Sequence, residues 1–435
     1  MNAGNRAVGP DMDGIRALTA PVGSRTTETA HVGDAVVFVV SLGMFVLSAL
    51  LDVGNDYVGW TVLTLTLLLG FHDAGRSSLG TVILFTGVTL FAIPYLSLIY
   101  VDAQVQVAWF AGFIIVAKAM FLFGDSNRAA AMPAPSSLNL PIIAVALGAG
   151  LLFWSDQGIL QISFYAGWAI AMVHLDRLHA STTSAVWRLA GVGLFVLSIG
   201  GYMLFFWGGY GRIIFISFML APLLLTVRYG TVRFNVFLFV GVIALLPFVG
   251  RVLRFGWSDG LAGLSEDSGA SPITLTSALW VNSSSVINPG SILEQWTLLF
   301  LGWVPREIWA GKPLGINSSF VDLFLGRQGV SMEHSTAIGY FGEHLFYLPT
   351  FWWVSAALLT AVIIVLRRLL ARYCAPFISP VIVLDVWLIT LFWGGMASFA
   401  ARAWFALLPM LAYVVVLKRL TTASNRAAAT ALAAR

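Results

Sequence analysis

Charge is the scarcest property of this 435-residue chain, because Asp, Glu, Lys and Arg together make up only 10% of it. A soluble core of this size needs a charged surface, which the sequence does not supply. Hydrophobic residues make up 59% of the chain, and the mean hydropathy is +0.87. The composition therefore excludes an ordinary soluble enzyme and predicts an all-α, polytopic integral membrane protein.

Cysteine and lysine are almost absent. The single cysteine, Cys374, excludes an intrachain disulfide and cannot by itself form a thiolate metal cluster. Three lysines accompany 21 arginines, and with so few charges the net charge of +4 does not indicate a nucleic-acid partner. The sequence also lacks a phosphate-binding loop, a dinucleotide fingerprint and an HExxH motif, so no metal or cofactor is predicted.

Long apolar runs define the domain organisation. Residues 1–33 are polar, without a helical apolar period, and predict a disordered cytoplasmic tail. Nine runs of roughly spanning length in 34–250 and three in 349–417 predict about twelve transmembrane helices. Residues 251–348 form one large loop between these groups, and 418–435 form a second cytoplasmic tail. The last three runs lie near 349–366, 377–397 and 400–417.

The basic residues orient these helices. With the N-terminus inside, the basic residues of alternate loops and of the C-terminal tail fall on the cytoplasmic side, as the positive-inside rule requires. Both termini are then cytoplasmic and residues 251–348 face outward. The cytoplasmic set is Arg76, Arg128, Arg177, Arg188, Arg228, Arg233, Arg367, Arg368, Arg372, Lys418 and Arg419.

A second set of basic residues lies on or near the outer face, where membrane insertion disfavours positive charge. So many exceptions favour an anionic ligand at the outer leaflet, since guanidinium groups match phosphate oxygens bidentately. Anchoring to phospholipid headgroups and pairing with nearby carboxylates are the alternatives. The set is Arg212, Arg251, Arg254, Arg306, Lys312, Arg327 and Arg402.

Two charges fall inside predicted spans. Lys118 lies near the cytoplasmic end of the fourth span, where its long side chain is expected to snorkel to the interface. Asp385 lies near the same end of the eleventh span, where we expect a structural role.

The segment 291–348 is the most chemically loaded part of the chain. Ser291, with Glu294 three residues on, is a capping-box signature that predicts the start of a helix. The apolar run that follows is too short to span a membrane and predicts a helix in the interface. A further short helix is predicted to begin near Ser335.

The helix predicted to begin near Ser335 carries Gly339, Gly342 and the carboxylate of Glu343. Thr336, Gly339 and Glu343 share one face, and a strip with so little side-chain bulk is expected to let a ligand approach the backbone closely. Glu343 is therefore the leading candidate for a proton acceptor, with Glu333 and His334 as alternatives. The opposing interpretation is that Glu343 pairs with one of the arginines.

Two motifs in this segment resemble those of a known family. VPREIWAGKP, from Val304 to Pro313, and STAIGYFGEHLFYLP, from Ser335 to Pro349, resemble the bacterial O-antigen and exopolysaccharide repeat-unit polymerases. Those proteins often carry a Pro-Arg, aromatic, Lys-Pro segment and then a Gly-rich Gly-Glu segment before a spanning helix. Outside these motifs the resemblance is limited to the hydropathy layout and scattered arginines.

The resemblance implies a GT-C-like glycosyltransferase in the bacterial cytoplasmic membrane. Such an enzyme moves a growing glycan from its polyprenyl pyrophosphate onto a new lipid-linked repeat unit, and its expected protein partners are a chain-length regulator and a flippase. We expect the pyrophosphate-binding residues to contact this ligand rather than the core. They are Arg212, Arg254, Arg306 and Lys312, with Arg402 as a weaker candidate.

Two other functions stay open at this point. An O-antigen ligase uses the same donor but passes the glycan to a lipid A-core acceptor. A lipid-linked oligosaccharide flippase belongs to a different class, and it should line a central path with charges through many spans. The charges here are concentrated in one outer loop, which favours an enzyme.

The topology can be tested by cysteine labelling in a Cys374→Ser background. We expect an impermeant maleimide to label a cysteine at position 268 in intact cells, because 251–348 is predicted to face outward. A cysteine placed within 367–375 should be labelled only after lysis. Labelling of position 268 only after lysis would overturn the orientation.

Overall fold

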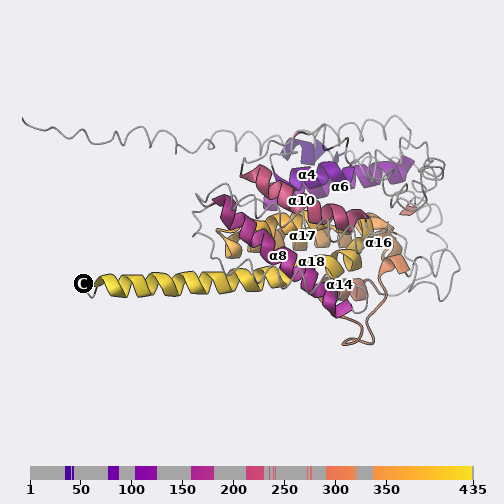
Figure 1. Cartoon of the computed structure of the whole chain (residues 1–435). Coiled ribbons are helices and arrows are strands. Elements are labelled where there is room, and N and C mark those ends of the chain that lie inside the picture. Colours follow the sequence, from indigo (N-terminus) through magenta and orange to yellow (C-terminus); the bar gives the residue numbers. More distant parts are fainter. Residues whose placement is uncertain are drawn as a thin grey trace, which may run out of the picture.

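The protein was analysed as a computed structural model in which every described element is an α-helix (Figure 1). Two segments, α17 (Trp352–Cys374) and Ser379–Ala423 within α18, are long and apolar enough to cross a membrane. The all-α prediction is confirmed for this part of the chain. The number of spans is not tested, because half of the twelve predicted spans lie wholly or partly outside it. The structure describes residues 35–40, 42–43, 77–87, 103–124, 158–180, 212–229, 235, 239, 241, 272, 275–276, 291–318, 320 and 337–433.

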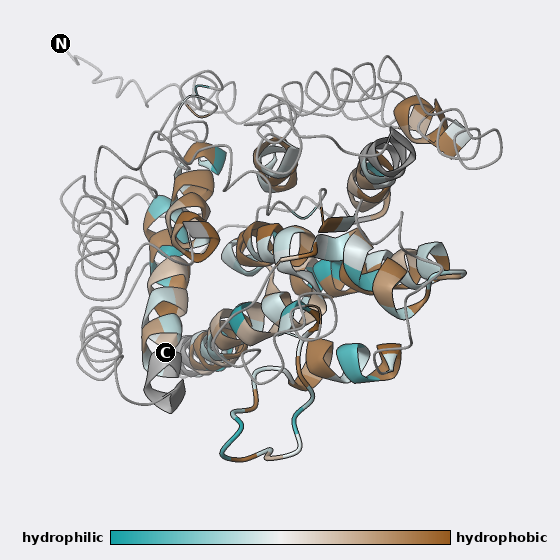
Figure 2. Cartoon of the chain, turned by 90° about the vertical axis from the view of Figure 1, so that its right-hand side faces the viewer, coloured by the Kyte–Doolittle hydropathy of each residue, from teal (hydrophilic) through white to brown (hydrophobic). Residues whose placement is uncertain are grey.

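The remaining described helices surround α18 (Ser379–Ala433), and each of them contacts it, α6 through the ring of Phe113 against Phe392. Brown, the colour of apolar residues, recurs along the ribbons of these helices in Figure 2, interrupted by paler and teal segments. They are α4 (Ser78–Gly87), α6 (Ala103–Gly124), α8 (Gly158–Ala180), α10 (Arg212–Arg228), α14 (Ile292–Leu301) and α16 (Gly339–Tyr347).

A non-helical residue divides α18 into two arms. Gly395 has φ 76° and ψ −171°, which ends the first arm, 379–394, and starts the second, 396–433. In one straight helix, residues 387 and 405 would lie about 27 Å apart. Instead both of their rings pack against Tyr165 of α8, at centroid distances of 5.9 and 5.8 Å. The two arms therefore form an antiparallel hairpin.

The far end of the hairpin lies beside the C-terminal end of α17. Asp385 of the first arm pairs with Arg367, and Lys418 of the second arm donates to the carbonyl of Tyr373. Two separate runs, 377–397 and 400–417, were predicted here. The structure has two helical arms in their place, with the turn a few residues earlier than expected.

The first arm begins at a cap supplied by another helix. The Asp176 carboxylate of α8 accepts hydrogen bonds from the backbone amides of Ile378 and Ser379, each at 2.8 Å, and a third from the Tyr229 hydroxyl at 2.6 Å. Amides in the first turn have no partner within their own helix, so a carboxylate there stabilises the start of α18. The next residue, Pro380, suits a first turn because it has no amide to satisfy.

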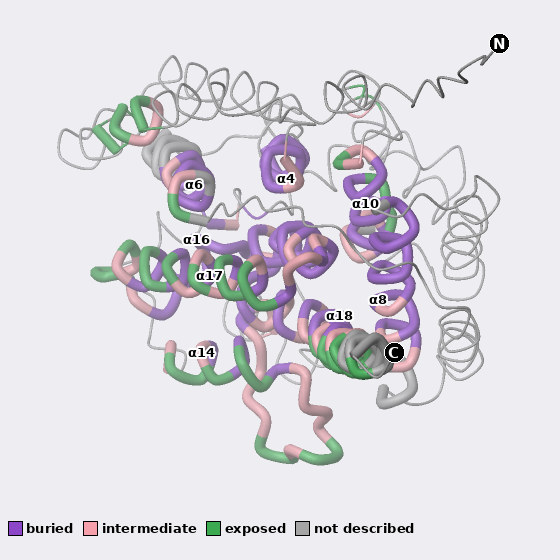
Figure 3. Tube along the Cα trace, turned by 90° about the vertical axis from the view of Figure 1, so that its left-hand side faces the viewer, coloured by how far each residue is buried: buried purple, intermediate pink, exposed green. Residues whose placement is uncertain are grey.

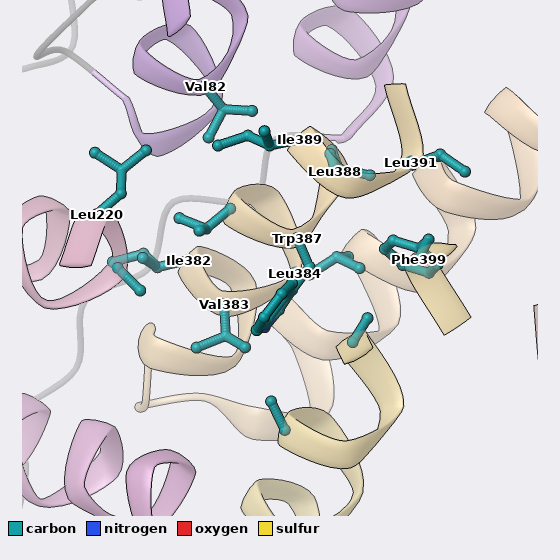
Figure 4. Packing of buried hydrophobic residues seen from close by; sticks show 14 of the residues in the cluster. Val82, Leu220, Ile382, Val383, Leu384, Trp387, Leu388, Ile389, Leu391 and Phe399 are labelled. Atoms are coloured by element: carbon teal, nitrogen blue, oxygen red, sulfur yellow. The ribbon is translucent and has the colours of Figure 1, made fainter. Parts of the chain in front are cut away.

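Aromatic and aliphatic side chains of the arms form the centre of the core. Trp387 has no exposed surface and packs edge-on against Phe218 of α10, at 5.5 Å between centroids. Figure 4 shows Val82 of α4 beside Ile389 of the first arm, and Leu220 of α10 near Ile382. Burial of such side chains is the main favourable term that holds the helices together outside lipid.

The two predicted intramembrane charges behave differently. The structural role of Asp385 is confirmed, because it accepts from Arg367 Nε at 2.8 Å and from the Ser78 hydroxyl at 2.5 Å, joining α17, α18 and α4. Lys118 was expected to snorkel, but its side chain is only 4% exposed within α6. The structure buries this residue among its neighbours instead of extending it to the surface.

The hairpin turn generates a stability prediction. A Cβ at Gly395 would lie 2.5 Å from the Glu343 carboxylate, in a backbone conformation that L-residues rarely adopt. Gly395→Ala should therefore lower the free energy of unfolding by about 2 kcal/mol or more. Gly311→Ala is the matched control, because a Cβ there has nothing within 4 Å. Equal thermal midpoints for the two variants would show that the turn tolerates a side chain.

Candidate functional site

The candidate site begins with α14, whose start follows the predicted signature. The Ser291 hydroxyl accepts from the amide of Leu293 at 3.1 Å, which confirms the cap. One face of the helix is buried through Gln295 and Leu298, while Leu293 on the other face is 70% exposed. A short helix with an exposed apolar face suits the interfacial position expected from the sequence.

Lys312 terminates α14. Its Nζ donates to the carbonyls of Gly302 at 2.5 Å and Val304 at 2.9 Å, just beyond the last helical residue. Carbonyls at a helix C-terminus lack partners within the helix, and a lysine there also interacts favourably with the helix dipole.

Arg306 braces the other side of the same loop. Its Nη1 donates to the carbonyl of Lys312 at 2.7 Å, and its Nη2 donates to the carbonyl of Pro313 at 3.1 Å. Arg306 and Lys312 therefore both hold the 302–313 loop together. The expectation that these two side chains contact only a ligand is therefore wrong, because both donate hydrogen bonds to the protein. Each still has N–H donors that are not used within the loop.

This loop concentrates positive charge. Burial lowers the pKa of Lys312, nearby Arg306 lowers it further, and Glu307 opposes the shift. Neither cation forms an ion pair with a carboxylate in the described part of the chain. Figure 3 shows the loop after α14 as half-buried and exposed segments. Two half-buried like charges are thus held side by side, an arrangement that an anion would stabilise.

The loop lies directly on the second arm of α18. A Cβ at Gly302 would come within 3.0 Å of the Ala400 side chain, and a Cβ at Gly315 within 2.9 Å of the Ala397 side chain. Glycine facing alanine lets the two backbones approach closely. The indole of Trp404 adds a hydrogen bond of 2.6 Å to the carbonyl of Leu299 in α14.

Arg402 projects from this arm. It is half-buried, and its Nη1 donates to the carbonyl of Ser398 one turn earlier, at 3.0 Å. The structure therefore places Arg402 on the arm that carries the Arg306–Lys312 loop. No carboxylate among the described residues pairs with it.

Asn317, which the sequence analysis did not single out, joins the end of the loop to the hairpin turn. Its Nδ2 donates to the carbonyl of Gly394 at 3.0 Å and to the hydroxyl of Ser398 at 3.1 Å. Its Oδ1 accepts from the amide of Ile338 at 3.4 Å, just before α16. One asparagine in a loop carries no sequence signal for such a role.

Glu343 of α16 holds the turn from the opposite side. Its Oε2 accepts from the amide of Met396, the first residue of the second arm, at 2.7 Å. The side chain has no exposed surface, and its Oε1 has no hydrogen-bond partner among the described residues. Glu343 forms no ion pair within the described residues either, so the salt bridge considered as an alternative is not seen there.

Burial controls the protonation of this part of α16. It raises the pKa of Glu343 from an ordinary 4.5 to about 8, opposed by the hydrogen bond from Met396. Burial likewise lowers the pKa of the neighbouring His344 to about 3. Both side chains are therefore largely uncharged at neutral pH.

The glycine strip of α16 contacts protein instead of a ligand. A Cβ at Gly339, where φ is +71°, would lie 2.7 Å from the Trp109 ring and 2.8 Å from the carbonyl of Phe392. A Cβ at Gly342 would lie 2.7 Å from the Thr276 hydroxyl. The interpretation that these glycines open a face to a ligand is therefore wrong, since they allow close helix packing.

The other predicted site residues are not described in the same detail. Arg212 is the first residue of α10, and its side chain lies outside the described part. Arg254, Glu333 and His334 also lie outside it. Across the described residues, no group of three or more His, Cys, Asp or Glu side chains is placed to hold a metal ion.

Comparison with known proteins adds no relative to this geometry. No family model, no curated protein and no solved structure matches the chain. The function is therefore inferred from the motifs and from the site itself.

The buried carboxyl generates a pH-dependent prediction. Because the pKa of Glu343 is raised on folding, its contribution to stability is fully present below pH 4.5 and is lost as pH rises through about 8. Glu343→Gln keeps the shape and an acceptor for Met396 but cannot ionise. We expect this variant to match the wild type near pH 5 and to unfold at a higher temperature near pH 9.

The control for this experiment is Glu294→Gln, since Glu294 is exposed in the first turn of α14. Its effect on the thermal midpoint should be small at both pH values. If Glu343→Gln instead lowers the midpoint by the same amount across the range, the carboxyl is ionised in the folded protein and has a charged partner.

Proposed function

We propose that the chain is a membrane glycosyltransferase that polymerises polyprenyl-pyrophosphate-linked oligosaccharide repeat units. The reaction would take place at the outer face of the bacterial cytoplasmic membrane, on lipid-linked donor and acceptor. The observation that carries the proposal is the pair of adjacent cations, Arg306 and Lys312, neither of which forms an ion pair with a carboxylate among the described residues. This loop is also the first of the two motifs that resemble the repeat-unit polymerases.

The proposed reaction is a glycosyl transfer that releases an anion. An acceptor hydroxyl oxygen forms a bond to the anomeric carbon of the donor, while the bond from that carbon to the pyrophosphate oxygen breaks. The electron pair leaves with the polyprenyl pyrophosphate, so negative charge develops on its bridging oxygen. Arg306 and Lys312, with Arg402 on the adjoining arm, would stabilise that charge through donors not used within the loop.

The acceptor hydroxyl must lose its proton as the new bond forms. Glu343 stays the leading acceptor in this proposal, but its oxygens have no contact with solvent, so it would need the turn at Gly395 to open. Because burial keeps the carboxyl protonated, it must lose its proton before it can act as a base, and turnover should therefore rise with pH. Glu333 and His334, in the same outer loop, are the alternatives.

A transporter is the second candidate, and the structure contains a feature that favours it. Secondary transporters commonly use interrupted helices whose half-helix ends face a site at membrane depth. The turn at Gly395 likewise leaves two helix ends inside the protein beside the buried and protonatable Glu343, although its arms run antiparallel and do not continue one helix. An O-antigen ligase would use the same lipid-linked donor as the polymerase and would differ from it only in the acceptor of the glycan.

Polysaccharide from a deletion strain separates the three functions. Loss of a polymerase should leave single-repeat material on the acceptor and remove the longer ladder seen on a gel. Loss of a ligase or a flippase should remove the single repeat as well. An unchanged ladder would contradict all three assignments.

Complementation of that strain tests the cations. Arg306→Lys should abolish the ladder nearly as fully as Arg306→Ala, because a lysine can reproduce neither the two carbonyl contacts nor a bidentate phosphate contact. Arg368→Lys is the matched control, because Arg368 is exposed at the other end of the bundle. Membrane levels of each variant are measured alongside. A normal ladder with Arg306→Ala would remove this residue from the site.

A further inference from the structure

The hairpin turn of α18 frees backbone groups that a continuous helix would satisfy. The carbonyl of Gly394 and the amide of Met396 stand on either side of Gly395, and because all three residues are buried these groups need hydrogen-bond partners inside the protein. Glu343 accepts from the amide, and Asn317 donates to the carbonyl. Two side chains from different segments thus complete one turn.

Asn317 reaches the proposed anion site through Ser398. The hydroxyl of Ser398 accepts from Asn317, while its carbonyl accepts from Arg402. On the loop side, Asn317 follows Gly315, which packs on Ala397 of the same arm. Asn317, five residues after Lys312, therefore joins the chain segment that carries the loop cations to the arm that carries Arg402.

We propose that Asn317 is a positioning residue that fixes the Arg306–Lys312 loop relative to Arg402, so that the three cations can hold one pyrophosphate group. This inference rests on the proposed function. Asparagine suits the position because it must donate to Gly394 and Ser398 and accept from Ile338 at the same time. Neither a carboxylate nor an aliphatic side chain of the same size can do both.

Binding of inorganic pyrophosphate to the purified protein tests the proposal. Asn317→Leu keeps the size of the side chain, adds no charge and removes all three hydrogen bonds. We expect pyrophosphate to bind at least about tenfold more weakly to this variant, since one lost charge-assisted contact changes affinity by that order. Ser398→Ala removes one of the three bonds and should give a smaller loss in the same direction.

Tyr340→Phe is the matched control for general destabilisation. It removes two buried hydrogen bonds of the Tyr340 hydroxyl, one donated to the carbonyl of Ala356 and one shared with the hydroxyl of Thr360, both away from the loop. It should lower the thermal midpoint to a similar degree and leave pyrophosphate affinity within about twofold of wild type. If affinity simply followed the midpoint in both variants, the role of Asn317 would be structural only, and the inference would be overturned.

A distance measurement tests the positioning without any ligand. Spin labels at positions 307 and 408, both exposed, report on the loop and on the second arm in a Cys374→Ala background. We expect one narrow distance distribution in the parent protein and in Tyr340→Phe, and a broadened one in Asn317→Leu. A narrow distribution in Asn317→Leu would overturn the inference.

These outcomes separate the inference from the proposed function. If the wild type binds pyrophosphate and Arg306→Ala does not, but Asn317→Leu binds as the control does, the inference alone fails. If the wild type and Arg306→Ala both fail to bind pyrophosphate, the proposed function fails, and the inference fails with it.

Discussion

The hydrogen bond from the Met396 amide to the Glu343 carboxyl is the contact on which the rest of the arrangement depends. It lies where a long apolar helix reverses direction, a reversal that leaves backbone groups without helical partners. With Asn317 supplying the other partner, the chain can turn within its own core instead of at the surface. That reversal sets the direction of the two arms. It also places the second arm where the cationic loop packs against it.

The cationic loop shows how one side chain can serve structure and ligand together. Arg306 has five N–H donors and directs two nitrogens at loop carbonyls, so it keeps donors for an oxyanion. Lys312 caps α14 in the same way. A site built from residues that already brace their own loop is preorganised, which lowers the cost of binding.

The sequence predicts those features that depend on local chemistry. Spacing alone predicts the Ser291 cap, and an isolated charge in an apolar run predicts the structural role of Asp385. The sequence could not predict the contact of Glu343. Its partner is a backbone amide 53 residues away, and every residue except proline has a backbone amide. The role of Asn317 could not be predicted either, because its partners Gly394 and Ser398 are also distant in the sequence. The glycines of α16 were misread because a bare face serves helix packing and ligand access equally well.

The helix that fills the centre of the core also follows every other described helix in the chain, so it is synthesised after them. α18 contacts α4, α8, α10, α14, α16 and α17, so the inner faces of helices made much earlier lack their packing partner until the C-terminal part emerges. Domains generally assemble as units during translation, with earlier segments folding first. The earlier helices therefore lack these contacts until the hairpin has been made, and a premature stop at the start of α18 would remove them from all six helices.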